Sequence, residues 1–382
     1  MRFLFGILCL ASAVCAKHVI FSFGDSYTST AFSVFSTLPS ESNPFGNPTF
    51  NMTYSTNGIN WIKYLATEYN SSTYVVYNLA VAGSTIDNNI TNFRPNYRSF
   101  VEQVEQTYLP YLSPSGAYVL EGSVTWNPAE TTTTVWFGIN DIVTTYQEYN
   151  TAVARVSLYA RMMQSYWSAV ETLYKSGMKN FIIMTVPAID YQLAYSDQQL
   201  TLLHAAITDY NAVLKSSAES FAAMHRDDTK LEVVDMYLAV WYIVDNYKSF
   251  GFEVQRAFCE AYADGVPFPD TWYADCEYPA DDYVYINSAH VTTDVHRQFA
   301  QIIATKLEDI GVPIGGDADK AREFASEIFN SSRKIKNLEA ADNFELFTSA
   351  QATASTSLLT AMSIPVVTVS LSKPYGMVYI GS

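Results

Sequence analysis

The stretch HVIFSFGDS, residues 18–26, decides the fold of this 382-residue chain. Its first seven residues form an apolar run that ends at Gly24, which is typical of a short buried strand. The polar residues Asp25 and Ser26 follow at once. Two later stretches have the same design, YVVYNLAVAG at 74–83 and TTTTVWFGIND at 131–141. We therefore predict three strands that each run into a glycine and a short polar segment.

Further strands are predicted at 181–189 and 231–237, and helical patterns separate most of the strands. Helices are expected at 58–69, with Asn57 as a cap, and at 101–112, 149–177, 197–225, 238–250 and 294–310. Strands that alternate with helices imply a parallel sheet covered on both faces. The predicted fold class is α/β, a three-layer α/β/α sandwich around a central, mostly parallel five-stranded sheet.

The first 16 residues, MRFLFGILCLASAVCA, have the pattern of a secretory signal peptide. Arg2 precedes an apolar run, and small residues allow cleavage after Ala16. A buried N-terminal helix is the alternative. Loss of Arg2 would change the formal net charge from −16 to −17, which disfavours nucleic acid and anionic membranes as partners. We expect a secreted, extracellular monomer with no stable membrane insertion.

The cysteines and glycosylation sequons agree with export. After removal of the signal only Cys259 and Cys276 remain, and two cysteines in an oxidising compartment most simply form a disulfide. Asn-x-Ser/Thr sequons, which mark candidate glycosylation sites, occur at Asn51, Asn70, Asn89 and Asn330.

The amino-acid composition of the chain changes near residue 313. The expected organisation is a signal peptide at 1–16, a main domain at 17–312 and a C-terminal extension of unknown role at 313–382. The extension begins with one or two helical patterns and continues through a Ser/Thr/Ala-rich stretch. Its last apolar run is interrupted by Pro365 and is too short to span a membrane comfortably.

The polar segments after the first three strands carry the chemistry. Ligands of open α/β sheets bind beyond the carboxyl ends of the strands, so one topology brings Ser26, Gly83 and Asn140 to a common crevice. Each motif alone has an ordinary explanation as a turn or a cap. Their order and their shared position after strands favour a functional site.

Four segments resemble, in order, the sequence blocks of GDSL-type hydrolases, the SGNH superfamily. They are FSFGDSYTSTAF (21–32), YNLAVAGSTIDN (77–88), VWFGINDI (135–142) and INSAHVTTDVH (286–296). The resemblance covers about residues 18–310. The motifs are most similar to those of secreted fungal acetylesterases that act on plant-wall oligosaccharides.

The resemblance implies that Ser26 is the nucleophile. The backbone N–H groups of Ser26 and Gly83 and the side-chain amide of Asn140 would form the oxyanion hole. Neutral donors fit this task, because they stabilise the negative oxygen without adding a competing charge. Asp25 and Asp141 are expected to be structural, hydrogen-bonded to nearby backbone.

Two histidines compete for the role of base, and the resemblance favours His290, because His290-Val291-Thr292 matches the His-Pro-Thr of the last block. His296 lies in a helical pattern and is expected to be a packed residue. The family usually has Asp three residues before the base, but this chain has Asn287. Asparagine accepts a hydrogen bond from the imidazole without supplying a negative charge.

Three interpretations of the departure at Asn287 remain open. In the first, which we favour, a Ser–His dyad works with help from Asn287. In the second, another acid, Asp281, Asp282 or Asp294, completes a triad. In the third, the site is impaired and the protein binds acetylated sugar without hydrolysing it.

The sequence predicts a secreted serine esterase that hydrolyses acetyl esters, with plant-wall carbohydrates as the expected substrates. The reaction would pass through an acyl-enzyme, with no metal and no organic cofactor. The expected partner is a small-molecule or oligosaccharide ester. The alternatives are a lipase or lysophospholipase of the same superfamily, or a catalytically impaired carbohydrate-binding relative.

Overall fold

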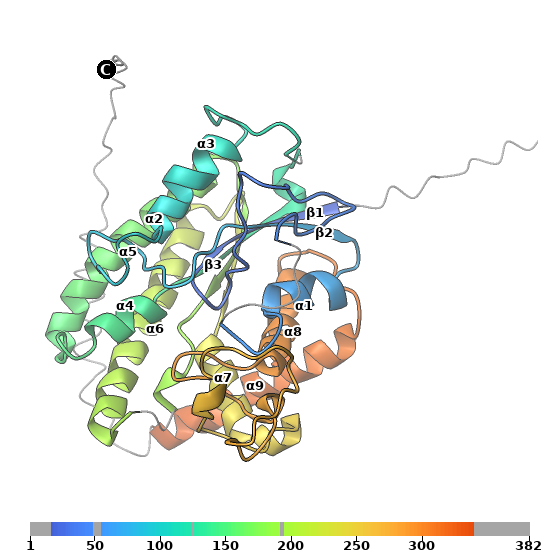
Figure 1. Ribbon diagram of the computed structural model, residues 1–382. Coiled ribbons are helices and arrows are strands. Elements are labelled where there is room, and N and C mark those ends of the chain that lie inside the picture. The colour runs from blue at the N-terminus through green and yellow to red at the C-terminus, as the bar shows by residue number, and fades with distance from the viewer. Residues whose placement is uncertain (1–16, 49–54, 124, 192–194, 340–382) are drawn as a thin grey trace, which may run out of the picture. The chain divides into compact units, whose positions relative to one another are not determined.

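The computed structural model describes residues 17–48, 55–123, 125–191 and 195–339 (Figure 1). The expected signal peptide, the sequon at Asn51 and the chain beyond residue 339 lie outside the described residues. No helix in the described part is long and apolar enough to cross a membrane.

Five parallel strands form one sheet in the order β2-β1-β3-β4-β5. This confirms the predicted fold class. Their bounds are Lys17–Gly24 (β1), Thr73–Asn78 (β2), Thr131–Trp136 (β3), Asn180–Met184 (β4) and Lys230–Val234 (β5). In the register, Gly24 is the partner of Trp136 and Ser22 the partner of Asn78. The carboxyl ends of the neighbouring strands β2, β1 and β3 therefore meet at one edge of the sheet.

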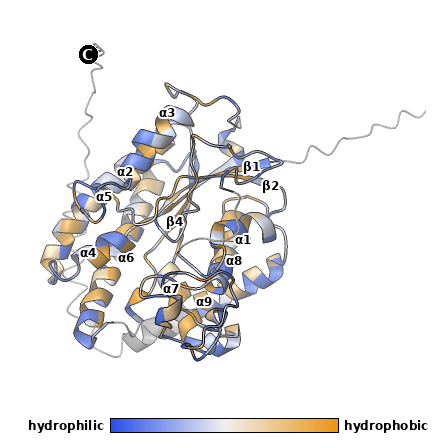
Figure 2. Ribbon diagram, in the orientation of Figure 1, coloured by the Kyte–Doolittle hydropathy of each residue, from blue (hydrophilic) through white to orange (hydrophobic). Residues whose placement is uncertain are grey.

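Helices cover both faces of the sheet. Helices α1 (Trp61–Glu68) and α8 (Thr293–Asp309) pack together on one face, and α5 (Ala152–Lys175) and α6 (Asp197–Met224) on the other (Figure 1). The long helices carry both hydrophilic and hydrophobic residues (Figure 2), as expected for helices with one buried face. The remaining longer helix of this region, α7, spans Met236–Asp245.

Two helical segments differ from the predicted pattern. The helix expected at 101–112 is composite, with α2 at Phe100–Glu102, a π-helix at Gln103–Tyr108 and α3 at Leu109–Tyr111. The polar segment after β3, for which a cap or a turn is the ordinary explanation, begins helix α4, Ile139–Thr145. Short 3-10 helices lie at Pro128–Glu130, Ile189–Tyr191, Tyr247–Phe250, Glu260–Tyr262 and Ala280–Asp282.

Asn57 does not cap the helix that follows it, and this prediction is wrong. Helix α1 begins only at Trp61. The Asn57 side chain instead joins two distant segments: its Oδ1 accepts from the backbone N–H of Thr293 (2.7 Å) and its Nδ2 donates to the carbonyl of Pro269 (3.0 Å). Asn57 therefore satisfies an orphan amide in the first turn of α8.

A disulfide joins Cys259 and Cys276 in the long loop between α7 and α8, with 5.7 Å between the two Cα atoms. The predicted pairing is present in the structure. Beside the disulfide a small apolar cluster forms within this loop, including Tyr262, Tyr283 and Ile286. The loop therefore has a core of its own.

The expected C-terminal extension begins with helix α9, Ala318–Glu339, and this helix packs against the body of the protein. The compact unit that contains the sheet runs to Leu338. Phe324 is 6% exposed, and its ring lies 5.4 Å from that of Phe250 and 6.2 Å from that of Tyr242. Helix α9 thus belongs, up to Leu338, to the compact unit that carries the sheet.

Candidate active site

The predicted nucleophile and the predicted base are in contact. Ser26 follows β1 directly, His290 lies just before α8, and the two are 264 positions apart in sequence. The Nε2 atom of His290 lies 2.7 Å from Oγ of Ser26. This is the distance at which an imidazole takes a proton from a hydroxyl.

Asn287 holds the His290 ring from the other side. Its Oδ1 accepts from the backbone N–H groups of Ala289 (3.0 Å) and His290 (2.9 Å) and lies 3.0 Å from Nδ1 of His290. Because the two backbone donors require an oxygen at this position, Nδ1 must carry the proton toward Asn287. Nε2 then presents its lone pair to Ser26.

No carboxylate in the described residues hydrogen-bonds to His290. Asp294 lies in the first turn of α8, where its Oδ1 is 3.7 Å from the guanidinium of Arg297. Asp281 and Asp282 lie on a separate 3-10 helix. Within the described residues, the position beside Nδ1 of His290 is therefore occupied by Asn287.

The two histidines differ in surroundings. His290 keeps some solvent access, but the protein around it removes most of the water that would stabilise a cation, and burial lowers its pKa to about 4. His296 is 1% exposed and packs against the rings of Tyr27 (5.7 Å) and Phe299 (5.4 Å). Burial, with a smaller contribution from His290, lowers the pKa of His296 to about 3. His296 is a packed residue, as expected.

The predicted oxyanion donors lie at the neighbouring strand ends. Gly83 has φ +82°, a conformation that favours glycine. The Asn140 amide donates to the carbonyl of Ser84 (2.8 Å), which fixes its orientation and leaves its second N–H for a ligand. Within the described chain, the backbone N–H groups of Ser26 and Gly83 have no hydrogen-bond acceptor. These groups suit a developing oxyanion.

Asp25 and Asp141 fix the loops of the site. Oδ1 of Asp25 accepts from the N–H of Tyr27 (3.0 Å), and both carboxylate oxygens of Asp141 accept from the N–H of Ile86 (3.3 and 3.2 Å). Both carboxyls are buried, and burial raises the pKa of each to about 7. Neither carboxyl hydrogen-bonds to His290, and the contacts of both are with nearby backbone.

Gln103 belongs to the site, although sequence reasoning missed it. Its fully buried amide accepts from the N–H of Gly24 (3.2 Å) and donates to the carbonyl of Gly24 (2.9 Å) and to Oγ of Ser84 (3.1 Å). It therefore joins the loop of Ser26 to the loop of Gly83. Its only sequence signal is its spacing of three residues from Phe100, on the buried stripe of the helix.

Two other side chains connect the segments that carry Ser26 and His290 to their surroundings. The Tyr27 hydroxyl donates to the carbonyl of Ala289 (2.8 Å), next to His290, and Oγ of Ser55 donates to the carbonyl of Ser26 (2.7 Å). Such contacts join residues that are far apart in sequence, so no local pattern announces them.

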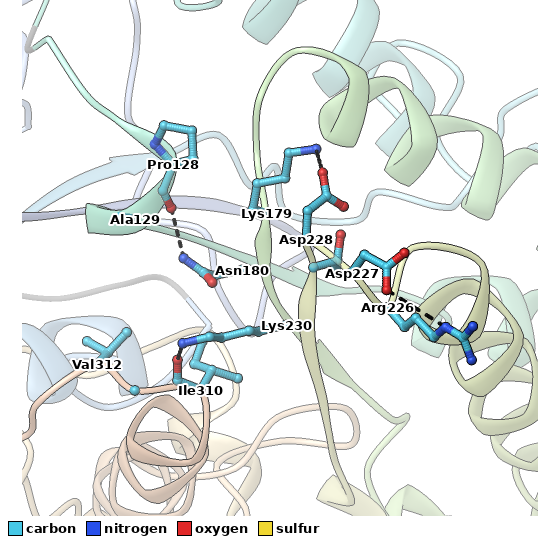
Figure 3. Close-up of a pocket in the computed structure, with 12 residues that line it drawn as sticks. Pro128, Ala129, Lys179, Asn180, Arg226, Asp227, Asp228, Lys230, Ile310 and Val312 are labelled. Carbon is cyan, nitrogen blue, oxygen red and sulfur yellow. Dashed lines mark hydrogen bonds and ion pairs between the residues drawn. The ribbon is translucent and has the colours of Figure 1, made fainter.

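A pocket of about 440 Å³ lies at the other edge of the sheet (Figure 3). It is lined near the start of β4 and β5 by Lys179, Asn180 and Lys230. Lys179 pairs with Asp228 (2.8 Å), and Lys230 donates to the carbonyl of Ile310 (2.6 Å). Because all strands are parallel, this pocket lies opposite the edge that carries Ser26. Among the described residues, no group of His, Cys, Asp or Glu side chains could hold a metal ion.

Comparison with known proteins agrees with this geometry. The model of the GDSL-like Lipase/Acylhydrolase family matches residues 20–303. An acetylesterase from Thermothelomyces thermophilus is 32% identical over 247 residues, which cover 63% of this chain and 78% of that protein. The protein is a carboxylic ester hydrolase. It belongs to the GDSL-like lipase/acylhydrolase family.

Solved structures give more distant likenesses. A variant of an acetyl xylan esterase from Geobacillus stearothermophilus is 14% identical, with a TM-score of 0.40 and coverage of 78% of this chain and 96% of that chain. A lipolytic protein of the G-D-S-L family from Veillonella parvula is 16% identical, with a TM-score of 0.38 and coverage of 78% and 98%. The fold and family assignments above rest on the sheet and on the sequence match.

Proposed function

We propose that the protein is a secreted serine esterase that removes acetyl groups from plant-wall carbohydrates. The observation that carries this proposal is the 2.7 Å contact between Ser26 Oγ and His290 Nε2, beside donors that suit an oxyanion. The named acetylesterase from Thermothelomyces thermophilus supports acetate as the acyl group.

The reaction follows from the positions of these groups. Neutral His290 takes the proton of Ser26 as Oγ attacks the acetyl carbonyl carbon, and the carbonyl oxygen becomes negative. The N–H groups of Ser26, Gly83 and Asn140 stabilise that oxygen. The sugar leaves with the proton from His290, and acetyl-Ser26 remains. Water, deprotonated by His290, then attacks the acetyl carbon. The bond to Oγ breaks, Oγ takes the proton back from His290, and acetate leaves.

The disulfide and the sequons support secretion. Disulfides persist in oxidising compartments, and Cys259 and Cys276 form one. Asn89 and Asn330 are exposed, as an oligosaccharide acceptor must be, whereas Asn70 is partly buried and its Nδ2 donates to the carbonyl of Ser72 (3.0 Å). We propose Asn89 and Asn330 as the better acceptors.

Substitution Ser26→Ala tests the nucleophile. It removes Oγ and adds no bulk, so the fold should keep its melting temperature while kcat on p-nitrophenyl acetate falls by about 10³ or more. Initial rates and a thermal melt of both proteins measure this. Retained turnover in the variant would reject Ser26 as the nucleophile.

The same assay with a series of acyl lengths tests the acetyl assignment. Acetate esters should have the highest kcat/KM of the series. A preference for long acyl chains would instead indicate a lipase or lysophospholipase. Failure of the wild type to turn over any ester or react with a fluorophosphonate at Ser26 would indicate an impaired site.

A further inference from the structure

The side chain of Arg94 lies over Gly83. A methyl group added to Gly83 would come within 2.8 Å of Cδ and 3.3 Å of Nε of Arg94. Gly83 is the residue whose N–H we assign to the oxyanion. The arginine therefore passes beside the position at which an ester carbonyl would bind.

The turn that carries Arg94 is fixed to the body of the protein. The N–H of Tyr97 donates to the carbonyl of Arg94 (2.9 Å), which closes the turn, and Nδ2 of Asn88 donates to the carbonyl of Tyr97 (2.9 Å). Oγ of Ser84, next to Gly83, donates to the carbonyl of Arg98 (2.6 Å). These contacts hold the backbone of the turn against the oxyanion loop.

Two aromatic rings flank the Arg94 guanidinium. Its Cζ lies 5.3 Å from the ring centre of Phe93 and 5.5 Å from that of Tyr97. Both rings are partly in solvent, with exposed fractions of 39% and 43%. The two rings offer the guanidinium cation–π contacts, and its N–H groups remain to bind a planar anion.

Arg94 is a cation that has no acidic partner among the described residues of this acidic protein. The chain has a formal net charge of −16. Arg155, Arg297 and Arg322 pair with carboxylates, but Arg94 forms no ion pair with any described residue. An unpaired guanidinium beside the site attracts an anionic group of a ligand, and a carboxylate matches its bidentate geometry.

We infer that Arg94 forms a carboxylate-binding subsite and makes the enzyme select acetylated saccharides that carry a uronic acid. The inference rests on the proposed function, because it places the sugar beside Gly83. The Arg94 N–H edge would bind the uronate, and the exposed faces of Phe93 and Tyr97 would contact the sugar ring. Arg94 is then a specificity-determining residue.

A matched pair of substrates tests this inference. The two substrates are acetylated methyl glucuronoside, which carries a carboxylate on the sugar ring, and acetylated methyl glucoside, which carries a hydroxymethyl group at the same position. We expect the wild type to favour the glucuronoside by about tenfold in kcat/KM, the size of one charge-assisted contact at a partly exposed site. Added salt should reduce the preference. Arg94→Gln should bring the ratio close to one, and Arg94→Lys should keep part of it.

Arg226→Gln is the matched control, because Arg226 lines the pocket at the opposite edge of the sheet. It should keep the wild-type ratio. A wild type without the preference, or an Arg94→Gln variant that loses activity equally on both substrates, would overturn the inference. If the wild type releases no acetate from either substrate in a Ser26-dependent way, the proposed function is instead rejected.

Discussion

The amide oxygen of Asn287 accepts two backbone N–H groups and the Nδ1–H of His290, and its Nδ2 lies 3.4 Å from the carbonyl of Ala263. An asparagine orients the imidazole as an aspartate would, but it adds no negative charge to stabilise the cation. Burial therefore sets the pKa of His290, which is lowered to about 4. A base with a lowered pKa stays neutral, and active, at lower pH.

This predicts an acid-tolerant pH profile that Asn287→Asp should change. In the wild type, the acid limb of kcat/KM should lie near pH 4, because this limb reports the pKa of the base in the free enzyme. A carboxylate beside Nδ1 favours the imidazolium, so Asn287→Asp should move the limb up by about 1–2 pH units. Rates measured across the acid range check the shift.

Asn287→Ala is the control for that experiment. It removes the oxygen that orients His290 and introduces no charge, so kcat should fall while the limb stays at low pH. A limb that does not move in Asn287→Asp would show that the carboxylate at this position does not reach the imidazole.

The residues that the structure brings together at the candidate site could be predicted from the sequence, because each belongs to a local pattern. Ser26 and Gly83 follow strands, Asn140 follows the third strand, and His290 lies in the last block. Gln103 and Arg94 could not be predicted, because what they do depends on a contact with a loop that is distant in sequence. The contact between Asn287 and the His290 ring could not be predicted with certainty, because it depends on the direction of the Asn287 side chain, which only the structure gives.

At the scale of elements, the disulfide loop supports Asn287, which contacts the proposed base His290. Ala263, whose carbonyl faces Asn287, lies between Cys259 and Cys276. The loop also carries Pro269, which is bound by Asn57. Closing the loop thus limits the motion of the segment against which the amide of Asn287 rests.

Replacing both cysteines with serine should reduce stability and activity. The two cysteines are 17 positions apart, and closure of a loop of this size contributes about 3 kcal/mol in the chain-entropy model. Denaturant unfolding measures the loss, and kcat should fall several-fold because Asn287 loses a fixed neighbour.

Treatment with a reductant provides the control. It should lower the melting temperature of the wild type and leave the double variant unchanged. Equal stability of the two proteins would mean that the loop core around Tyr262 suffices without the bond.

The order of strands and long helices was predictable because apolar periodicity specifies them. The exceptions are elements that tertiary contacts decide. Helix α4 begins immediately after the glycine that ends the third strand segment, with Asn140 and Asp141 in its first turn, so its polar start resembles a turn. Asn57 was expected at the helix nearest in sequence, and it serves one that is more than 200 residues away.

At the scale of the whole molecule, α9 completes the packing of the unit that contains the sheet. Phe324 and Ile328 are 6% and 5% exposed, and Arg322 pairs with Glu308 of α8 (2.6 Å). The amino-acid composition changes near residue 313. Composition alone does not reveal that the amphipathic helix after this point packs against the rest of the protein. The apolar stripe of α9 becomes informative only when its partners Tyr242 and Phe250 are known.

A chain that ends at residue 312 should therefore be less stable than one that ends at 338. Losing the burial of Phe324 and Ile328 should cost about 3–5 kcal/mol, and it would expose the aromatic rings beneath them. Thermal melts and binding of an apolar dye to the two truncated chains measure the difference. Equal melting temperatures would show that α9 adds nothing to the stability of the fold.

The asparagine at position 287 also has a genetic consequence. Asparagine and aspartate codons differ by a single base, so a carboxylate at this site is never more than one point mutation away. We expect that exchange to alter the acid range of activity and to leave Ser26, Gly83 and Asn140 unchanged, so a lineage could retune its acid range in one step.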